Sequence, residues 1–338
     1  MSTTGGEILY LMGTNFGPVT TDAAVALGVT SEPIVRYGAA GSVADNATEL
    51  SSDGQVYVAL NCRVRIAHVQ IMCTTASGFG VGHRWEVRMG EEARSTISSP
   101  LITTSYRPPV ILAVHGTGVE NGGTQGGQEV LIQGFGFHPD APMIAQYGAW
   151  TYVASSSTPD SSVDWTYQAR ACTVVVPHFS VRCLTAPGTG RNLPWSITVA
   201  DQDSAPHTSS NASYGPPVIT SIDGKGANDA DTSGGQSVTL RGGNFGPLGT
   251  DVAASYGAVS SSTAASDATA AYPQVYAAES CIVTGSGHDE ITCTTSPGVG
   301  RPLFWTVNVD GQNSTVPTTS YARPIIHNVT GSDGLPLT

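Results

Sequence analysis

The six cysteines of this chain fall into three pairs, and their spacing favours disulfide chemistry. The pairs are Cys62 with Cys73, Cys172 with Cys183, and Cys281 with Cys293, separated by 11, 11 and 12 residues. Each pair flanks a short predicted hairpin, and neighbouring antiparallel strands can bring two such cysteines within bonding distance. Zinc binding is the alternative, although zinc sites usually have closer Cys-x-x-Cys spacing and more ligands. We predict three disulfides, each contributing about 3 kcal/mol through loop entropy, and hence an oxidising compartment.

Four Asn-x-Ser/Thr sequons point to a second, covalent modification. They are Asn46, Asn211, Asn313 and Asn328. In a polar chain with paired cysteines, such sequons predict N-linked glycans on some of these asparagines, at exposed positions. Together with the cysteines they indicate an extracellular or cell-surface protein that carries covalent glycans.

The sequence lacks the motifs of enzymatic chemistry. None of its eight histidines lies in a Gly-x-Ser-x-Gly or His-Glu-x-x-His motif. The histidines also occupy mostly non-equivalent positions in the repeat described below, which is typical of surface residues. We therefore expect a protein that is not an enzyme and has no cofactor and no metal site.

Composition and charge narrow the partners and the fold class. The net charge is -12 with only 14 basic residues, and a surface of that sign repels nucleic-acid phosphates. No apolar run approaches the length that spans a bilayer. The 40 Gly and 21 Pro break short runs of Val, Ile, Thr and Tyr, which is the pattern of short antiparallel strands and turns. We expect an all-β protein that binds no nucleic acid and has no membrane span.

A threefold internal repeat places the cysteines within this pattern. The second cysteine of each pair recurs at steps of 110 residues, and a tryptophan follows it twelve residues later each time. A Tyr-Gly step, a Gly-Gly opening and a closing phrase, "SYRPPVI", "SYGPPVI" and "SYARPII", recur in the same order. The repeated tryptophans are Trp85, Trp195 and Trp305. About seven strand-like runs in each repeat predict an immunoglobulin-like β-sandwich, with the tryptophan between its two sheets or, alternatively, serving as a ligand platform.

The repeat resembles the IPT/TIG family of immunoglobulin-like domains. The resemblance rests on "GGQSVTLRGGNFGP", "YG" at Tyr256, "ITCTTSPGVG" and the strand opening "PPVITSI". It covers nearly the whole chain and is loosest at "GEILYLMGTNFGP" in the first repeat. The resemblance implies the immunoglobulin-like fold, found in extracellular tandem arrays and in intracellular DNA-binding proteins. The acidic charge and the paired cysteines favour the extracellular kind.

We predict three domains and a separate C-terminal strand. Their ranges are 1–107, 108–215, 216–322 and 323–338. In the second and third domains, a strand "PPVILAVHG" or "PPVITSIDG" precedes the Gly-Gly opening, and its second proline lies 17 residues before that opening in both cases. Domain 1 has only four residues before Gly5, whereas a matching segment, "RPIIHNVTG", follows domain 3. We therefore expect domain 1 to lack its own first strand.

The C-terminal segment has the sequence to fill this position in another copy. A sandwich without an edge strand exposes unpaired backbone groups and an apolar groove. The segment after Pro324 carries Ile325, Ile326 and Val329, and a bulge between Ile326 and Val329 would turn both inward. We predict that it enters domain 1 of the next copy beside Ile8 and Tyr10, as in donor-strand complementation. Such a head-to-tail contact forms a homopolymeric filament.

Two alternatives are open at this point. The chain can be one period of a longer covalent array, because 19 residues would then separate Pro324 from the next Gly5. It can also be part of a receptor or adhesin ectodomain, in which the tandem domains act as a binding or stalk module. Trp150 and Trp165 fall outside the repeated pattern. If exposed, they could contact glycans or a neighbouring filament, whereas local packing of a long loop is the simpler interpretation.

Overall fold

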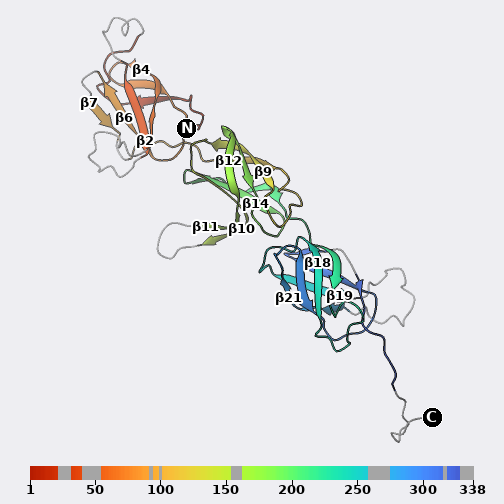
Figure 1. Cartoon of the computed structure of the whole chain (residues 1–338). Coiled ribbons are helices and arrows are strands. Elements are labelled where there is room, and N and C mark those ends of the chain that lie inside the picture. Colours follow the sequence, from red (N-terminus) through yellow and green to blue (C-terminus); the bar gives the residue numbers. More distant parts are fainter. Residues whose placement is uncertain are drawn as a thin grey trace, which may run out of the picture. The chain divides into compact units, whose positions relative to one another are not determined.

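The computed structural model describes residues 1–21, 32–39, 55–90, 94–98, 101–153, 162–257, 275–314 and 318–327. Within these ranges the regular structure is entirely antiparallel β and no helix is present, which confirms the all-β prediction. The strands form three modules, each made of two sheets (Figure 1). Residues 107 and 108 lie between the last strand of module 1 and the first of module 2, and residues 215 and 216 separate the strands of modules 2 and 3 in the same way.

Module 1 has a small sheet and a larger one. Its strands are β1 (Ile8–Met12), β2 (Ile34–Ala39), β3 (Val56–Val58), β4 (Leu60–Ile66), β5 (Gln70–Thr74), β6 (His83–Met89) and β7 (Arg94–Ile97). The described strands pair in the orders β1-β5-β4 and β3-β2-β6-β7.

Modules 2 and 3 follow a common plan. Module 2 consists of β8 (Val110–His115), β9 (Glu129–Phe137), β10 (Met143–Val153), β11 (Ser162–Gln168), β12 (Arg170–Val176), β13 (His178–Leu184), β14 (Leu193–Val199), β15 (Gln202–Asp203) and β16 (His207–Ala212). Its sheets are β12-β13-β9-β8 and β11-β10-β14-β15, with β16 also on β14. Module 3 consists of β17 (Val218–Asp223), β18 (Ser237–Gly243), β19 (Val252–Gly257), β20 (Val275–Ala277), β21 (Glu279–Val283), β22 (Glu290–Thr294), β23 (Leu303–Val309), β24 (Gln312–Asn313) and β25 (Thr318–Thr319). Its sheets are β17-β18-β22-β21 and β20-β19-β23-β24, with β25 on β23.

The chain divides into two compact units whose border runs through the loops of module 2. Unit 1 comprises Met1–Gly116, Glu129–Leu184 and Pro194–Asn211. Unit 2 comprises Thr117–Gln128, Thr185–Leu193 and Ala212–Thr338. Unit 1 therefore contains all of module 1 and nearly all strand residues of module 2. Unit 2 contains all of module 3 and the remaining three segments of module 2.

The repeated aromatic residues form the centre of each module. The ring of the Tyr-Gly tyrosine stacks on the repeated tryptophan, with centroids 4.3, 4.3 and 4.4 Å apart in modules 1, 2 and 3. Trp85, Trp195 and Trp305 are 4%, 0% and 0% exposed, which confirms their prediction as core residues. Stacked aromatic pairs contribute beyond the apolar area that they bury, so each pair, formed by neighbouring strands of one sheet, stabilises the core of its module.

All three predicted disulfides form, each between two adjacent strands. Cys62 is bonded to Cys73 across β4 and β5. The second bond, Cys172–Cys183, joins β12 to β13, and the third, Cys281–Cys293, joins β21 to β22. Because disulfides persist in oxidising environments, three of them place the protein outside the reducing cytosol.

Module 1 also contains a buried carboxylate. Glu86 of β6 is 0% exposed and lies 2.8 Å from Arg36 Nη2 and 2.7 Å from Arg88 Nε. Burial by itself raises the pKa of this carboxyl, but the hydrogen bonds from Arg88 and Arg36 outweigh burial and lower it. Glu86 is therefore ionised and paired inside the sheet β3-β2-β6-β7.

Candidate strand-acceptor site in module 1

Modules 2 and 3 show where the first strand of this fold belongs. In module 2, β8 pairs along the outer side of β9, and in module 3, β17 pairs along β18 in the same way. Counting from the Gly-Gly opening, β1 is the equivalent of β9 and β18. β1 pairs with β5 on one side, and none of the described residues pairs with its other side. The position of the first strand is thus open in the described part of module 1.

The open position leaves apolar side chains of β1 incompletely covered. Leu9 and Leu11 point toward the core but are only partly buried. Their equivalents in β9 and β18 are each 0% exposed: Val130, Ile132, Val238 and Leu240. Since the same inward positions are fully buried where a first strand is present, an added strand would complete the burial of Leu9 and Leu11.

Ile8 and Tyr10, the predicted acceptor residues, lie on β1 but on its outer face. Ile8 is 63% exposed and Tyr10 is 57% exposed. In a strand, neighbouring side chains point to opposite faces, so Ile8 and Tyr10 offer backbone pairing, whereas the inward side chains of β1 are those of Leu9 and Leu11. Leu9 and Leu11 were not predicted as acceptor residues, although the alternation in "ILYLM" contains the signal for their inward orientation.

In modules 2 and 3, a glycine lies where the backbone of the first strand passes closest to the next strand. At Gly134 in β9, a Cβ atom would lie 1.8 Å from the carbonyl oxygen of Val110, and at Gly242 in β18 it would lie 1.8 Å from that of Val218. Only glycine permits that approach. Gly13 occupies the equivalent position after β1, where the nearest neighbours of a Cβ would be atoms of the Phe16 ring. Module 1 therefore has the glycine that a crossing backbone needs.

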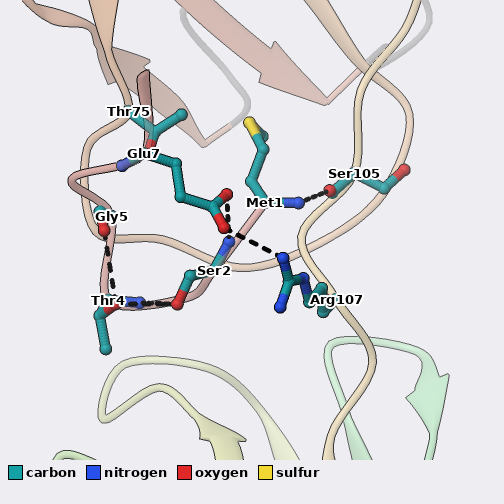
Figure 2. A network of polar contacts seen from close by, with 8 residues as sticks. All are labelled: Met1, Ser2, Thr4, Gly5, Glu7, Thr75, Ser105 and Arg107. Atoms are coloured by element: carbon teal, nitrogen blue, oxygen red, sulfur yellow. Dashed lines mark hydrogen bonds and ion pairs between the residues drawn. The ribbon is translucent and has the colours of Figure 1, made fainter. Parts of the chain in front are cut away.

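The segment that enters β1 is already in place (Figure 2). The Met1 amine donates a hydrogen bond to the Ser105 carbonyl at 2.7 Å, and Arg107 N donates to the Met1 carbonyl at 2.8 Å. Gly122 and Ala230 make the corresponding bonds in modules 2 and 3, forming parallel bridges with Tyr214 and Tyr321. In the described part of module 1, the entry to β1 is therefore held in place while the first-strand position is open.

Glu7 fixes this entry segment. Glu7 N donates to Thr75 Oγ1 at 3.1 Å, while its carboxylate accepts from Ser2 N at 2.8 Å and pairs with Arg107 at 3.2 Å (Figure 2). Gln128 and Gln236 make the backbone contact in modules 2 and 3, each to a threonine at 3.2 Å. The same local hydrogen bonds thus hold the start of β1, β9 and β18 in register with their neighbouring strands.

The candidate donor leaves module 3 without pairing. Residues 322–327 form no strand, and Figure 1 shows this segment leading away from the sheets of module 3. Pro324 is exposed, and Ile325 and Ile326 are 74% and 81% exposed. Val329, the fourth predicted donor residue, lies outside the described residues, as does Asn328.

The first strands of modules 2 and 3 give the register that a donor would adopt. In β8 the pairing with β9 shifts between Ile111 and Ala113, and in β17 the pairing with β18 shifts between Ile219 and Ser221. This bulge lets Ile111 and Val114, three residues apart, both face the core at 7% and 1% exposure. By the repeat, Ile326 and Val329 stand at the positions of Ile111 and Val114.

Trp150 and Trp165 lie on a β-ribbon, where a packed loop was the simpler expectation. They are directly opposite each other in the pairing of β10 with β11, beyond a bulge that follows Tyr147. Trp165 is half-buried, and the side chain of Trp150 is outside the described residues. Their suggested contact with glycans or neighbouring filaments stays a prediction.

The sequons differ in their surroundings. Asn313 in β24 is exposed, and its Oδ1 accepts a hydrogen bond from Asn308 at 2.7 Å. Asn211 in β16 is only half-exposed, and its side-chain oxygen is buried. Asn46 and Asn328 lie outside the described residues. Of the two described sequons, Asn313 has the geometry that better suits a bulky glycan.

Three of the eight histidines are exceptions to the mostly non-equivalent placement of the histidines in the repeat. His68, His178 and His288 recur every 110 residues, five residues before the second cysteine of each pair, so they are equivalent in the repeat. All three have positive φ, at 64°, 70° and 68°, a conformation uncommon for residues other than glycine. His178 and His288 are half-buried, whereas His68 is exposed. Their exact spacing was the signal, and it was missed because the other five histidines do not recur.

No family model and no curated protein matches this sequence. In the described ranges, no helix is long and apolar enough to cross a membrane. Among the same residues, no three His, Cys, Asp or Glu side chains are grouped so that they could hold a metal ion.

Proposed function

We propose that this protein is the structural subunit of an extracellular, glycosylated filament. In this proposal the modules are immunoglobulin-like domains of the IPT/TIG type, and the chain is not an enzyme. The C-terminal segment of one copy completes the sheet β1-β5-β4 in module 1 of the next copy. The observation that carries the proposal is the match between an open first-strand position in module 1 and an unpaired segment with first-strand sequence after module 3.

The expected pairing follows from the two complete modules. Ile326 would lie opposite Gly13 and Ile325 opposite Thr14, because Ile111 pairs with Gly134 and Val110 with Phe135. The Ile325 carbonyl would then take the place that the Val110 carbonyl has over Gly134. β-Strand addition of this kind gains main-chain hydrogen bonds and the burial of alternate side chains.

Apolar burial supplies much of the driving force. Ile326 and Val329 would contribute roughly 1.5–3 kcal/mol each on full burial, and Leu9 and Leu11 would lose their remaining exposure. Part of this gain is offset by the entropy of ordering the donor segment. The contact is heterologous, so it propagates from copy to copy unless its rotation closes a ring.

Truncation tests the proposal. A chain ending after Ala322 lacks the donor and should sediment as a monomer, whereas the full chain should form filaments visible by electron microscopy. A chain ending after Gly331 is the matched control, because β8 and β17 end at positions equivalent to Thr330; it should still assemble. Filaments formed by the chain ending after Ala322 would refute strand donation.

The covalent alternative gives a different result in denaturant. If copies are joined by strand donation, native material boiled in denaturant without reductant should collapse to the mass of one polypeptide, 34.7 kDa plus glycans. A longer covalent array, or a receptor ectodomain of which this chain is one part, would keep a higher mass. Persistent high mass would therefore replace the filament subunit by a tandem-domain ectodomain.

A further inference from the structure

A repeated contact joins each module to the one before it, and we call it the histidine joint. In unit 1, His178 Nδ1 of module 2 is hydrogen bonded to Thr3 Oγ1 of module 1 at 3.1 Å. In unit 2, His288 Nδ1 of module 3 is hydrogen bonded to Thr124 Oγ1, which precedes β9, at 2.9 Å. Two independent parts of the chain thus use the same pair of residue types at equivalent positions.

The threonine half of the joint has a third, unused copy in module 3. Thr3, Thr124 and Thr232 all lie two residues before the Gly-Gly opening. Their carbonyls accept equivalent hydrogen bonds, from Gly78, Gly188 and Gly298. Thr3 and Thr124 are 6% and 1% exposed, whereas Thr232 is exposed.

The histidine half has a third, unused copy in module 1. His68 N donates to the Gly17 carbonyl at 2.6 Å, as His288 N donates to the Gly246 carbonyl at 2.7 Å. The backbone therefore presents the two imidazoles in the same way. His68 is exposed, while His288 is half-buried in its joint.

An asparagine strengthens the likeness between modules 1 and 3. "NFGP" occurs at residues 15–18 and again at residues 244–247. Asn244 accepts a hydrogen bond from Thr124 N at 3.4 Å and donates one to the Pro216 carbonyl at 3.2 Å. Asn15 has the same left-handed backbone, with φ of 65° against 61°, and is exposed.

The surface around Thr232 is hollowed in a way that can receive the incoming residues. Thr232, Tyr321 and Arg323 line an open hollow of about 830 Å³ at the base of the donor segment. The corresponding hollow in unit 1 is about 390 Å³, and there Thr3 and His178 are both among the lining residues. The hollow in module 3 is where a third joint would form.

We propose that the contact between successive copies is a third histidine joint, in which His68 and Asn15 of one copy dock on Thr232 and the Arg323 carbonyl of another. This inference rests on the proposed filament and adds a second interface beside the donated strand. One difference from the two existing joints is expected. Gln202 and Gln312 donate hydrogen bonds to the carbonyls of Tyr106 and Tyr214. The equivalent position in the first repeat is a glutamate, Glu92, which lies outside the described residues.

Crosslinking of cysteine pairs tests the joint in the full chain. All six native cysteines are disulfide-bonded, so a short bismaleimide reacts only with introduced thiols. The variant His68→Cys with Thr232→Cys should give a ladder of covalently joined chains on a denaturing gel. The matched control, Thr3→Cys with His178→Cys, places the same joint inside one chain and should react without forming a ladder.

A third pair separates failure of the joint from failure of the filament. Thr14→Cys with Ile325→Cys reports the donated strand and should also give a ladder. If this pair gives a ladder and the internal control reacts, but His68→Cys with Thr232→Cys does not, the joint is wrong and strand donation stands. If neither intermolecular pair gives a ladder and no filament sediments, the proposed function itself fails.

A milder substitution covers the case in which a cysteine variant misfolds. His68→Ala should raise the critical concentration for assembly roughly 2- to 12-fold, the factor expected from one hydrogen bond. His115→Ala, an exposed histidine at the end of β8, is the control and should leave the critical concentration unchanged. An unchanged critical concentration for His68→Ala would overturn the joint, provided that removal of the donor segment still abolishes assembly.

Discussion

Two adjacent isoleucines of the donor segment should differ sharply in their contribution to assembly. Ile326 is 81% exposed in the free chain, and its equivalents Ile111 and Ile219 are both 7% exposed. Ile325 is 74% exposed, and its equivalents Val110 and Val218 keep 45% and 42% exposure. Ile326 would therefore lose most of its exposure to water on docking, whereas Ile325 would lose about two fifths of its exposure.

The magnitudes follow from the buried carbon. An Ile→Ala change removes three carbons, at about 0.8 kcal/mol for each one buried, and leaves a cavity that adds to the loss. Ile326→Ala should weaken assembly by about 2–3.5 kcal/mol, which is roughly 30- to 400-fold in the dissociation constant. Ile325→Ala should cost about 0.7 kcal/mol, or roughly threefold.

Sedimentation of the full-length variants over a range of concentrations measures the critical concentration directly. Both isoleucines are exposed in the free chain, so neither change should move the melting temperature of the isolated monomer. That melting temperature is the control for folding. Equal effects of the two substitutions, or a larger effect of Ile325→Ala, would refute the register derived from β8 and β17, because a shift by one residue exchanges the two faces of a strand.

Three further predictions concern the modules themselves. Replacing Cys172 and Cys183 by serine should lower the free energy of unfolding by about 3 kcal/mol, and an unchanged denaturation midpoint would contradict this. Burial lowers the pKa of His83, so the unfolded chain binds its proton first as pH falls below about 6.5. Thermal stability should therefore decrease from pH 7 to pH 5, and His83→Phe should reduce that slope in calorimetry. Glu86→Gln should destabilise module 1 by about 2 kcal/mol, less than the roughly 3–5 kcal/mol of a fully buried ion pair, because its arginine partners are partly exposed. The control is Glu129→Gln, which affects a surface ion pair whose two side chains are at least half-exposed, and it should change the free energy of unfolding by less than about 1 kcal/mol. Equal denaturation midpoints for the two variants would contradict a stabilising role for the buried Glu86 carboxylate.

The repeated sequence markers allowed much of the fold to be predicted from the sequence. The cysteine spacing predicted all three disulfides, and the recurrence of Trp85, Trp195 and Trp305 predicted the core. Both predictions succeeded because bonding across a hairpin and burial of a large ring depend on local spacing and residue type, which three copies of a repeat make visible.

The tertiary structure located the bulge that the sequence pattern only suggested, and it identified the inward side chains of β1. A period-2 reading of the tail puts Ile326 and Val329 on opposite faces, and the bulges of β8 and β17 show how both can face inward. The inward side chains of β1 are those of Leu9 and Leu11, because the pleat of β1 turns Ile8 and Tyr10 outward.

By itself, the sequence determined that the chain repeats three times, that its cysteines pair within each repeat, and that a segment similar in sequence to the first strands of modules 2 and 3 follows the third repeat. The tertiary structure alone decided that His178 and His288 meet threonines of the preceding modules, and that His68 and Thr232 are left exposed. The physical reason is that a sequence repeat identifies which positions of the chain are structurally equivalent, but not which of them are in contact. Whether two such positions touch depends on how loops from different modules approach each other, and strand periodicity does not encode that approach.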